Sequence, residues 1–542
     1  MSARLACAAL LFLSSAAPSL AGCARPSLAP KPTPAVPAFS ATPADASPAT
    51  ISVPAIVEQR VEALGIDYVF RASRLTNLAW QLDCLAGFGR CSQPAYEALW
   101  RDRLQTDPDL HAALARWGDL RRQLRGPVGE RLESHSLLPL PQRKADLWQR
   151  VRLASVTAVT EAQYRSELSA LTDPESAAAL GAVVARFDLA FSTIWEQAVP
   201  VLQRAMSEQA ALQRRADVAL TVRRVAGFYG GSSTPPIMRF DLLYRPEHPS
   251  ADFATQLLDH GLIEVVATAK PELRIQPPVH EMFHYLFASA PFQKLDDLAS
   301  RFAASPDPQA LAAYGLLDEV LATGLAQGVL GRELAPAELE ARLAAPRKLY
   351  DDPFVDAVTK AFLPELGALL QKSGADRTVF SAEFQAAYLG AVKSAFPRGL
   401  PPAADLRPFA CAYSKDLEKA YQALRVASGS QLVGSSDQPD DEDTRALLEG
   451  HPTWGRVLLL KPNELSALRR YGKSLTPTAV ALLRANARRN DRFAYATRAS
   501  GAGPVFVLVA DSDEHAQKLI TEFMHLPTMF SGLTLAHPRT GT

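Results

Sequence analysis

Apolar residues recur every three or four positions over most of the chain, and this spacing predicts helices. The pattern is helical from about residue 56 to residue 221, and it returns from about residue 279 to residue 426. Between them, residues 237–244 and 262–267 are rich in aliphatic side chains, and Gly, Pro and Ser bound the stretches. These two segments are predicted to be strands.

The C-terminal ninety residues have a different pattern. Continuous apolar runs at residues 456–460 and 505–509 predict buried strands, and stretches near residues 464–471 and 514–523 have helical spacing. A small α/β unit is expected here. The residues before it, 429–450, are polar and acidic and are predicted to form a linker.

These patterns together predict an α+β fold that is predominantly helical. We expect a helical domain at residues 55–221, a central core at 222–428, the linker at 429–450 and the α/β unit at 451–542. A length of 542 residues agrees with several domains, since single cores usually stop growing near 250–300 residues.

Composition and charge argue against a disordered chain, a nucleic-acid-binding protein and a membrane-spanning protein. Hydrophobic residues make up 48% of the chain and charged residues 21%, which is ordinary for a folded protein. The chain has 57 basic and 57 acidic side chains, so no net charge favours binding to nucleic acid, and we expect no such partner. No apolar run in the sequence reaches the roughly 18–20 residues that span a bilayer.

The N-terminus has the features of an export signal. Arg4 precedes an apolar stretch at residues 5–13, and small residues follow. The sequence Leu-Ala-Gly-Cys at residues 20–23 resembles the lipobox of bacterial lipoproteins. The resemblance implies a signal peptide at 1–22 and a lipid on Cys23 that holds the protein to a membrane. The alternative is ordinary cleavage nearby, with Cys23 unmodified.

Residues 23–54 are rich in Pro, Ala, Ser and Thr, so they are predicted to form an extended tether. We therefore expect a protein of the bacterial cell envelope whose globular part is periplasmic or extracellular. Ala24 replaces the Asp that marks inner-membrane retention in some bacteria, which favours the outer membrane.

One short motif carries recognisable chemistry. His280, Glu281 and His284 lie in an apolar stretch that begins with two prolines, Pro277 and Pro278, as a helix often does. Two His four positions apart project from one helix face and can bind one metal ion. Glu281 stands where it can accept a proton from water on that metal. The alternative is a pair of ordinary core or surface histidines.

This His-Glu-x-x-His motif resembles the active-site helix of the zincin metallopeptidases. The metzincin subgroup is excluded, because Phe287 and Ala290 occupy the positions of its Gly and third His. The gluzincin subgroup takes its third ligand from a Glu on a later helix. Glu319, followed by the small residues Ala322 and Thr323, resembles that ligand. The alternatives left open are Asp318, Glu333, Glu338 and Glu340.

The resemblance implies a zincin-like core, Zn²⁺ as cofactor, a peptide or protein substrate and Glu281 as general base. The exopeptidase motif of the related aminopeptidases is absent, which favours an endopeptidase. Thermolysin-like members carry an Asp one turn after the ligand Glu, where it orients a ligating His, but this chain has Thr323 there. The partner of that His is therefore different or comes from elsewhere. Residues 262–267 fit the edge strand that holds substrate in this superfamily.

Two points stay open in the sequence. The oxyanion-stabilising residue is not chosen among the candidates Tyr314, Tyr350, Tyr388 and Tyr413. The chain could also be a non-catalytic lipoprotein, a binding or scaffold module that retains a zincin-like core, or an assembly protein with an accidental motif.

The cysteines indicate a structural role. Cys84 and Cys91 are separated by six residues, and an exported protein meets an oxidising compartment, so a disulfide between them is expected. The alternative is two free buried thiols. Cys411 is then left over, and we expect it to be buried.

Overall fold

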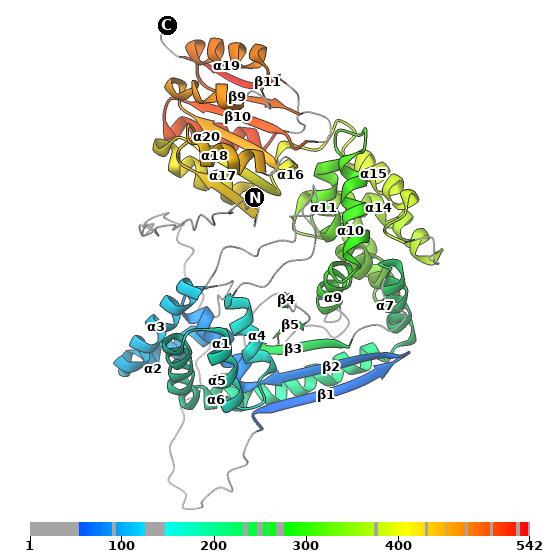
Figure 1. The fold of residues 1–542 in the computed structure, drawn as a ribbon. Coiled ribbons are helices and arrows are strands. Elements are labelled where there is room, and N and C mark those ends of the chain that lie inside the picture. The colour runs from blue at the N-terminus through cyan, green and yellow to red at the C-terminus, as the bar shows by residue number, and fades with distance from the viewer. Residues whose placement is uncertain are drawn as a thin grey trace, which may run out of the picture. The chain divides into compact units, whose positions relative to one another are not determined.

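Helices dominate the structure, and two mixed β-sheets accompany them (Figure 1). The prediction of an α+β, predominantly helical fold is thus confirmed. This computed structural model describes residues 54–88, 94–124, 147–230, 237–245, 253–257, 260–266, 276–372, 378–428, 432–450, 453–471, 475–498, 502–526 and 532–539.

The first sheet has five strands in the order β1-β2-β3-β5-β4. Its strands are β1 Ile56–Ala63, β2 Ile66–Ser73, β3 Met238–Arg245, β4 Phe253–Leu257 and β5 His260–Val266. The pairs β2–β3 and β3–β5 are parallel, whereas β1–β2 and β4–β5 are antiparallel. Leu64 and Gly65 close the β1–β2 hairpin with φ values of 51° and 78°, as a tight two-residue turn requires.

The sheet corrects two predictions. Residues 56–73 form a hairpin instead of a helix, and in β2 the alternate side chains Ile66, Tyr68, Phe70 and Ala72 are buried, as the period of two of a half-buried strand demands. Residues 262–267 are not the edge strand, because β5 lies between β3 and β4, and β4 is at the edge.

In the described part of the N-terminal half, seven helices accompany this sheet. They are α1 Arg74–Leu85, α2 Pro94–Thr106, α3 Pro108–Leu124, α4 Leu147–Thr157, α5 Glu161–Leu171, α6 Pro174–Gln213 and α7 Ala216–Phe228. The long helix α6 packs along β1, β2 and β3 (Figure 1). Among the described helices, α6 alone has the length and composition to cross a membrane. Its apolar face, with Phe187, Phe191 and Trp195, is buried in the core, which explains that composition.

The helices after the sheet carry the motif. They are α9 Gln276–Ala288, α10 Phe292–Ala303, α11 Ala310–Thr323, the π-helix η2 Gly324–Leu330, α12 Gly331–Leu334, α13 Pro336–Ala344, α14 Pro353–Gln371, α15 Ala382–Ala395 and α16 Pro402–Asp405. Helix α9 packs against β4, β5, α11 and η2. Added Cβ atoms at Gly324 and Gly328 would lie 2.7 and 2.3 Å from Leu side chains of α14, so glycine permits this close packing.

The second sheet has six strands in the order β11-β9-β10-β8-β6-β7. Its strands are β6 Pro408–Tyr413, β7 Leu432–Ser436, β8 Gly455–Leu460, β9 Asn490–Thr497, β10 Val505–Ala510 and β11 Gly532–Pro538. Its helices are α17 Glu418–Ser428, α18 Glu442–Gly450, α19 Pro477–Arg489 and α20 Asp513–Met524. Apolar cores lie on both faces, under α17 and α20 on one and under α18 and α19 on the other.

The C-terminal unit is therefore larger than predicted. Strands β6 and β7 belong to its sheet, although we placed residues 408–428 in the central core. Residues 429–450 contain β7 and α18, so this stretch is not only a linker. Residues 464–471 form the short 3-10 helices η4 Pro462–Glu464 and η5 Ala467–Tyr471 instead of an α-helix.

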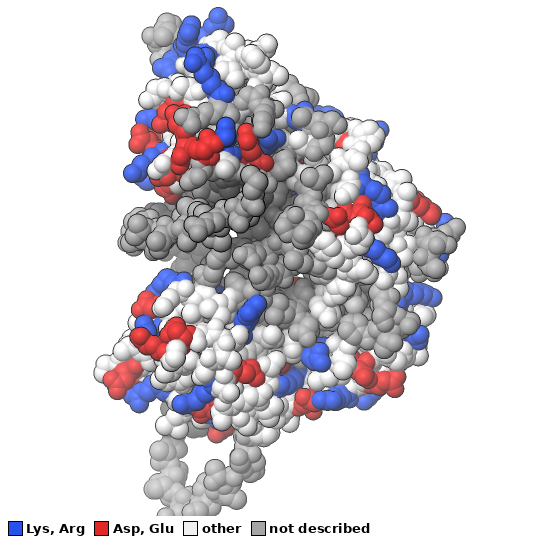
Figure 2. All heavy atoms as spheres, in the orientation of Figure 1, with Lys and Arg blue, Asp and Glu red and all other residues white. Residues whose placement is uncertain are grey.

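Charged side chains of both signs are interspersed on the face in Figure 2. This distribution agrees with equal numbers of basic and acidic residues in the sequence.

Candidate metal centre

His280 and His284 lie one turn apart on α9, and their imidazoles face each other. Their Nε2 atoms are 3.1 Å apart, and the ring centroids are separated by 4.7 Å at an interplanar angle of 81°. The apolar side chains of Val279, Met282 and Phe283 on the same helix are buried. This packing leaves the two imidazole nitrogens directed at one point beside α9.

Glu319 on α11 completes a triangle with the two imidazoles. Its Oε2 atom is 3.6 Å from His280 Nε2 and 3.6 Å from His284 Nε2. Ligand atoms about 2.0–2.1 Å from a tetrahedral zinc ion lie roughly 3.3–3.4 Å from one another. The three observed separations of 3.1, 3.6 and 3.6 Å bracket that value. The three atoms therefore fit one face of a tetrahedral zinc site.

The same geometry is costly without a cation or a proton between the groups. Two imidazole nitrogens and a carboxylate oxygen bring electron pairs together at one point, away from bulk water. His280 Nδ1 is also buried and has no hydrogen-bond partner among the described residues. Within the described part of the chain, these are the one group of three or more His, Cys, Asp or Glu residues whose ligand atoms could hold a metal.

Asp318 is the partner of the second nitrogen of His284. Its Oδ1 atom lies 2.8 Å from Nδ1 of His284. A carboxylate there fixes the tautomer, with the proton on Nδ1 and the lone pair of Nε2 directed at the site. The sequence has no acid one turn after Glu319. Asp318, the residue before Glu319, takes that place and contacts the nitrogen of His284 that faces away from the triangle.

Tyr350 lies next to the site, in the segment between α13 and α14. Its hydroxyl donates a 2.8 Å hydrogen bond to Glu319 Oε2, and its ring stacks on His280 with centroids 5.9 Å apart. Of the four tyrosines in question, Tyr350 is the one that the structure brings to the three ligand candidates. Tyr388 donates to the carbonyl of Ala313, Tyr413 stacks on Tyr421 in the second sheet, and Tyr314 packs on Phe302.

Electrostatics at the site favour a bound cation. Burial lowers the pKa of His284, but the carboxylates of Asp318 and Glu319 outweigh it and raise that pKa well above its usual value. Burial raises the pKa of Glu319, yet contacts with His280 and His284 hold it far below its usual value. The negative potential that stabilises a proton on His284 also stabilises a divalent metal ion there.

Glu281 lies on α9 between the two histidines and is half-buried. Burial, together with the charges of Glu319 and Glu281, raises the pKa of Tyr350 well above its usual value. Glu281 therefore lies within electrostatic range of Tyr350. Tyr350 stays protonated at neutral pH and can act as a hydrogen-bond donor.

The alternative third ligands have other positions. Asp318 contacts Nδ1 of His284, the nitrogen that points away from the triangle. Glu333 accepts a 2.9 Å hydrogen bond from Thr221, Glu338 pairs with Arg342 at 2.6 Å, and Glu340 is exposed on α13. Glu319 is the carboxylate whose oxygen lies next to both Nε2 atoms.

The structure tests the predictions for the cysteines only in part. Cys84, at the end of α1, is disulfide-bonded, whereas Cys91 lies outside the described residues, so their pairing stays a prediction. Cys23 also lies outside the described residues. Cys411 is a free, fully buried thiol on β6, and burial raises its pKa.

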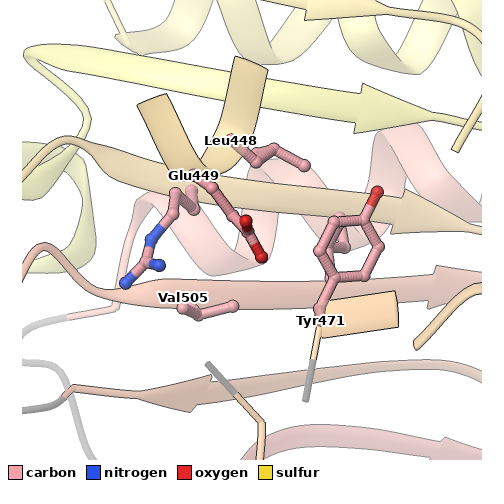
Figure 3. A pocket seen from close by; sticks show the side chains of 6 residues that line it. Leu448, Glu449, Tyr471 and Val505 are labelled. Carbon is pink, nitrogen blue, oxygen red and sulfur yellow. The ribbon is translucent and has the colours of Figure 1, made fainter. Parts of the chain in front are cut away.

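A small pocket in the C-terminal unit offers no comparable chemistry (Figure 3). It is lined by Leu448, Glu449, Arg456, Leu458, Tyr471 and Val505. Tyr471 donates a 2.8 Å hydrogen bond to the carbonyl of Pro439, and burial lowers the pKa of Arg456 while Glu449 opposes that shift. Arg456 also donates a 3.0 Å hydrogen bond to the carbonyl of Gly503, so these polar groups bind backbone of the unit and indicate structural support.

Comparisons of the chain with protein-family models, curated proteins and solved structures gave no match.

Proposed function

We propose that this chain is a zinc-dependent peptidase whose metal ligands are His280, His284 and Glu319. The observation that carries the proposal is the triangle of two Nε2 atoms and one Oε2 atom, with sides of 3.1, 3.6 and 3.6 Å. Two His, one Glu and an open position are a recognised catalytic zinc set. A zinc ion held there would supply Lewis acidity to the attacking water and to the peptide carbonyl.

Glu281 is the proposed general base. It follows His280 on α9, and a carboxylate next to a metal ligand on such a helix is placed to accept a proton from the attacking water. The same carboxyl group then gives that proton to the leaving amine. Because one group accepts and donates, the reaction needs no further acid.

Tyr350 is the proposed donor to the oxyanion of the tetrahedral intermediate. Its hydroxyl lies 2.8 Å from Glu319 Oε2, so it is beside the proposed metal position. A preorganised O–H directed at developing negative charge is the type of group that stabilises such a transition state. The high pKa of Tyr350 keeps that proton in place.

The edge strand β4 supports a peptide substrate. It ends the first sheet, and α9 packs against it. A sheet edge offers backbone N–H and C=O groups with which an extended peptide can pair. We propose an unfolded or extended protein segment as the substrate and cleavage within the chain, as in an endopeptidase.

The proposal is tested by metal dependence. The purified full chain is expected to contain about one zinc ion per molecule by elemental mass spectrometry and to cleave an unstructured protein such as casein. A chelator should remove both zinc and activity, and added zinc, but not added calcium, should restore both. Absence of zinc from the active protein, or cleavage that survives removal of zinc, would contradict the proposal.

We also propose that a lipid on Cys23 holds the enzyme to a bacterial envelope membrane, the outer membrane being favoured. Substitution Cys23→Ser is expected to move the protein from the membrane fraction to the soluble fraction, because the acyl chains supply the membrane affinity. Fractionation and the mass of the N-terminal peptide measure this. A variant that stays membrane-bound to the wild-type extent would mean that another feature is the anchor.

A further inference from the structure

Residues 345–352 connect α13 to α14 and carry Tyr350; they are called the Tyr350 segment below. The buried carboxylate of Asp356, in the first turn of α14, binds this segment. Asp356 is 4% exposed. Its Oδ1 atom accepts hydrogen bonds from the backbone N–H groups of Leu349 at 2.9 Å and Tyr350 at 3.1 Å, and its Oδ2 atom accepts one from Arg347 at 3.1 Å. Three hydrogen bonds to one side chain within four residues leave this stretch of backbone little freedom.

Lys360, one turn further along α14, completes the arrangement. Its Nζ atom lies 2.9 Å from Asp356 Oδ2 and donates a 2.6 Å hydrogen bond to the carbonyl of Ala345. A buried carboxylate is tolerated when its charge is offset and its oxygens are hydrogen-bonded, and here both conditions hold. The start and the end of the segment are thus held by the same helix.

The backbone within the segment is held in an unfavourable conformation. Arg347 has a φ of 55°, a region that non-glycine residues rarely adopt. Such a conformation persists when its surroundings over-determine it, and it is common beside functional sites. The N–H of Arg347 is one of the three groups that Asp356 binds.

We propose that Asp356 is a positioning residue that holds Tyr350 against the metal ligands. The backbone N–H of Tyr350 bonds to Asp356, while its hydroxyl bonds to Glu319 and its ring stacks on His280. Asp356 therefore acts on the site through Tyr350. The inference rests on the proposed function for its catalytic meaning, but the placement of Tyr350 is testable without metal or substrate.

The first experiment is a double-mutant cycle on zinc affinity, measured by competition with a chromophoric chelator. Tyr350→Phe removes the hydrogen bond to Glu319, and loss of such a partner of a ligand lowers metal affinity about 10-fold or more. Asp356→Ala is expected to cause a similar loss, and the double variant is expected to lose no more than either single variant. Losses that multiply in the double variant would overturn the proposal.

A matched control separates positioning from general destabilisation. Ser381 caps the neighbouring helix α15 by accepting a hydrogen bond from the N–H of Phe384 at 3.1 Å, and it is not among the residues that bind the Tyr350 segment. Ser381→Ala should lower the melting temperature but leave zinc affinity unchanged. If Asp356→Ala does not fold, a variant with both Asp356→Asn and Lys360→Gln replaces it, since this variant keeps one acceptor oxygen without a buried charge. It should also lower zinc affinity, and addition of Tyr350→Phe should cause no further loss.

The second experiment needs no metal. A 3-fluorotyrosine at position 350 of the full chain reports the environment of that ring by fluorine NMR. Substitution of Asp356 should move its resonance toward the free amino-acid value, whereas Ser381→Ala should not. An unchanged resonance would overturn the positioning role. A chain that binds no zinc would overturn the peptidase proposal, and the fluorine result would still decide the role of Asp356.

Discussion

Substitution Glu281→Gln is expected to abolish most peptide hydrolysis while zinc stays bound. Gln has nearly the same shape but cannot accept a proton, and a positioned general base contributes about 10²–10⁴-fold to the rate. Glu281 is outside the group of ligand atoms formed by His280, His284 and Glu319, so the metal site itself is preserved. We therefore expect kcat to fall by at least about 10²-fold at unchanged zinc content.

The measurement pairs a cleavage assay with elemental analysis of the same preparation. Glu340→Gln is the matched control, because Glu340 is an exposed glutamate on α13 and its loss should leave both quantities unchanged. If Glu281→Gln cleaves at the wild-type rate, the activity arises from another site. If wild-type protein binds zinc but does not cleave, the chain is a non-catalytic binding or scaffold module, which is the alternative that the sequence left open.

Removal of His280 is expected to cause the largest loss of zinc. Structural zinc sites bind with apparent free energies of about 10–16 kcal/mol, so one ligand among four accounts for roughly 3 kcal/mol, or a fall of about 100-fold in affinity. His280→Ala is cleaner than His284→Ala, because Nδ1 of His280 has no partner among the described residues, whereas loss of His284 leaves Asp318 unpaired. Activity should disappear with the metal.

Asp318→Asn provides the comparison for this variant. It keeps all three ligands and alters only the partner of His284 Nδ1, so we expect about a 10-fold loss of zinc affinity. Isothermal titration or chelator competition distinguishes the two sizes of effect. Equal affinities for wild-type and His280→Ala protein would show that the triangle is not the metal site.

The local part of the site was predictable because it depends on helix geometry alone. Residues 280, 281 and 284 lie within five positions, and the pitch of a helix fixes how their side chains point. Glu319 was predicted by resemblance, because it and the small residues Ala322 and Thr323 match the gluzincin pattern. Both small residues are fully buried on α11, the helix that packs against α9. The structure brings its carboxylate to both imidazoles.

The side chains that contact these three candidate ligands were not predictable in the same way. Asp318 was considered as a metal ligand, but in the structure its carboxylate contacts Nδ1 of His284. Tyr350 was one of four equal candidates, because nothing near it in the sequence indicates which side chain it will meet. Its position depends on the segment that Asp356 holds, and that carboxylate reaches backbone groups six to nine residues before it.

The fold shows the same division. The helices around the motif, the strand near residue 240 and the strands near residues 458 and 507 follow from apolar spacing. The β1–β2 hairpin was missed, although the alternation of Ile66, Tyr68, Phe70 and Ala72 was present in the sequence. The extent of the second sheet was also missed, since β6 and β7 become strands of that sheet only by pairing with each other and with β8.

The sequence by itself determined the elements whose side chains interact within a few residues: the motif on α9, the apolar helices and the buried strands. Only the tertiary structure decided which strand lies at the sheet edge, which acid serves His284 and which tyrosine reaches Glu319. Those relations join residues 31 and 34 positions apart, or whole strands. Packing of α11 and the first sheet against α9, and of α14 against α11, sets them. No local periodicity encodes that packing.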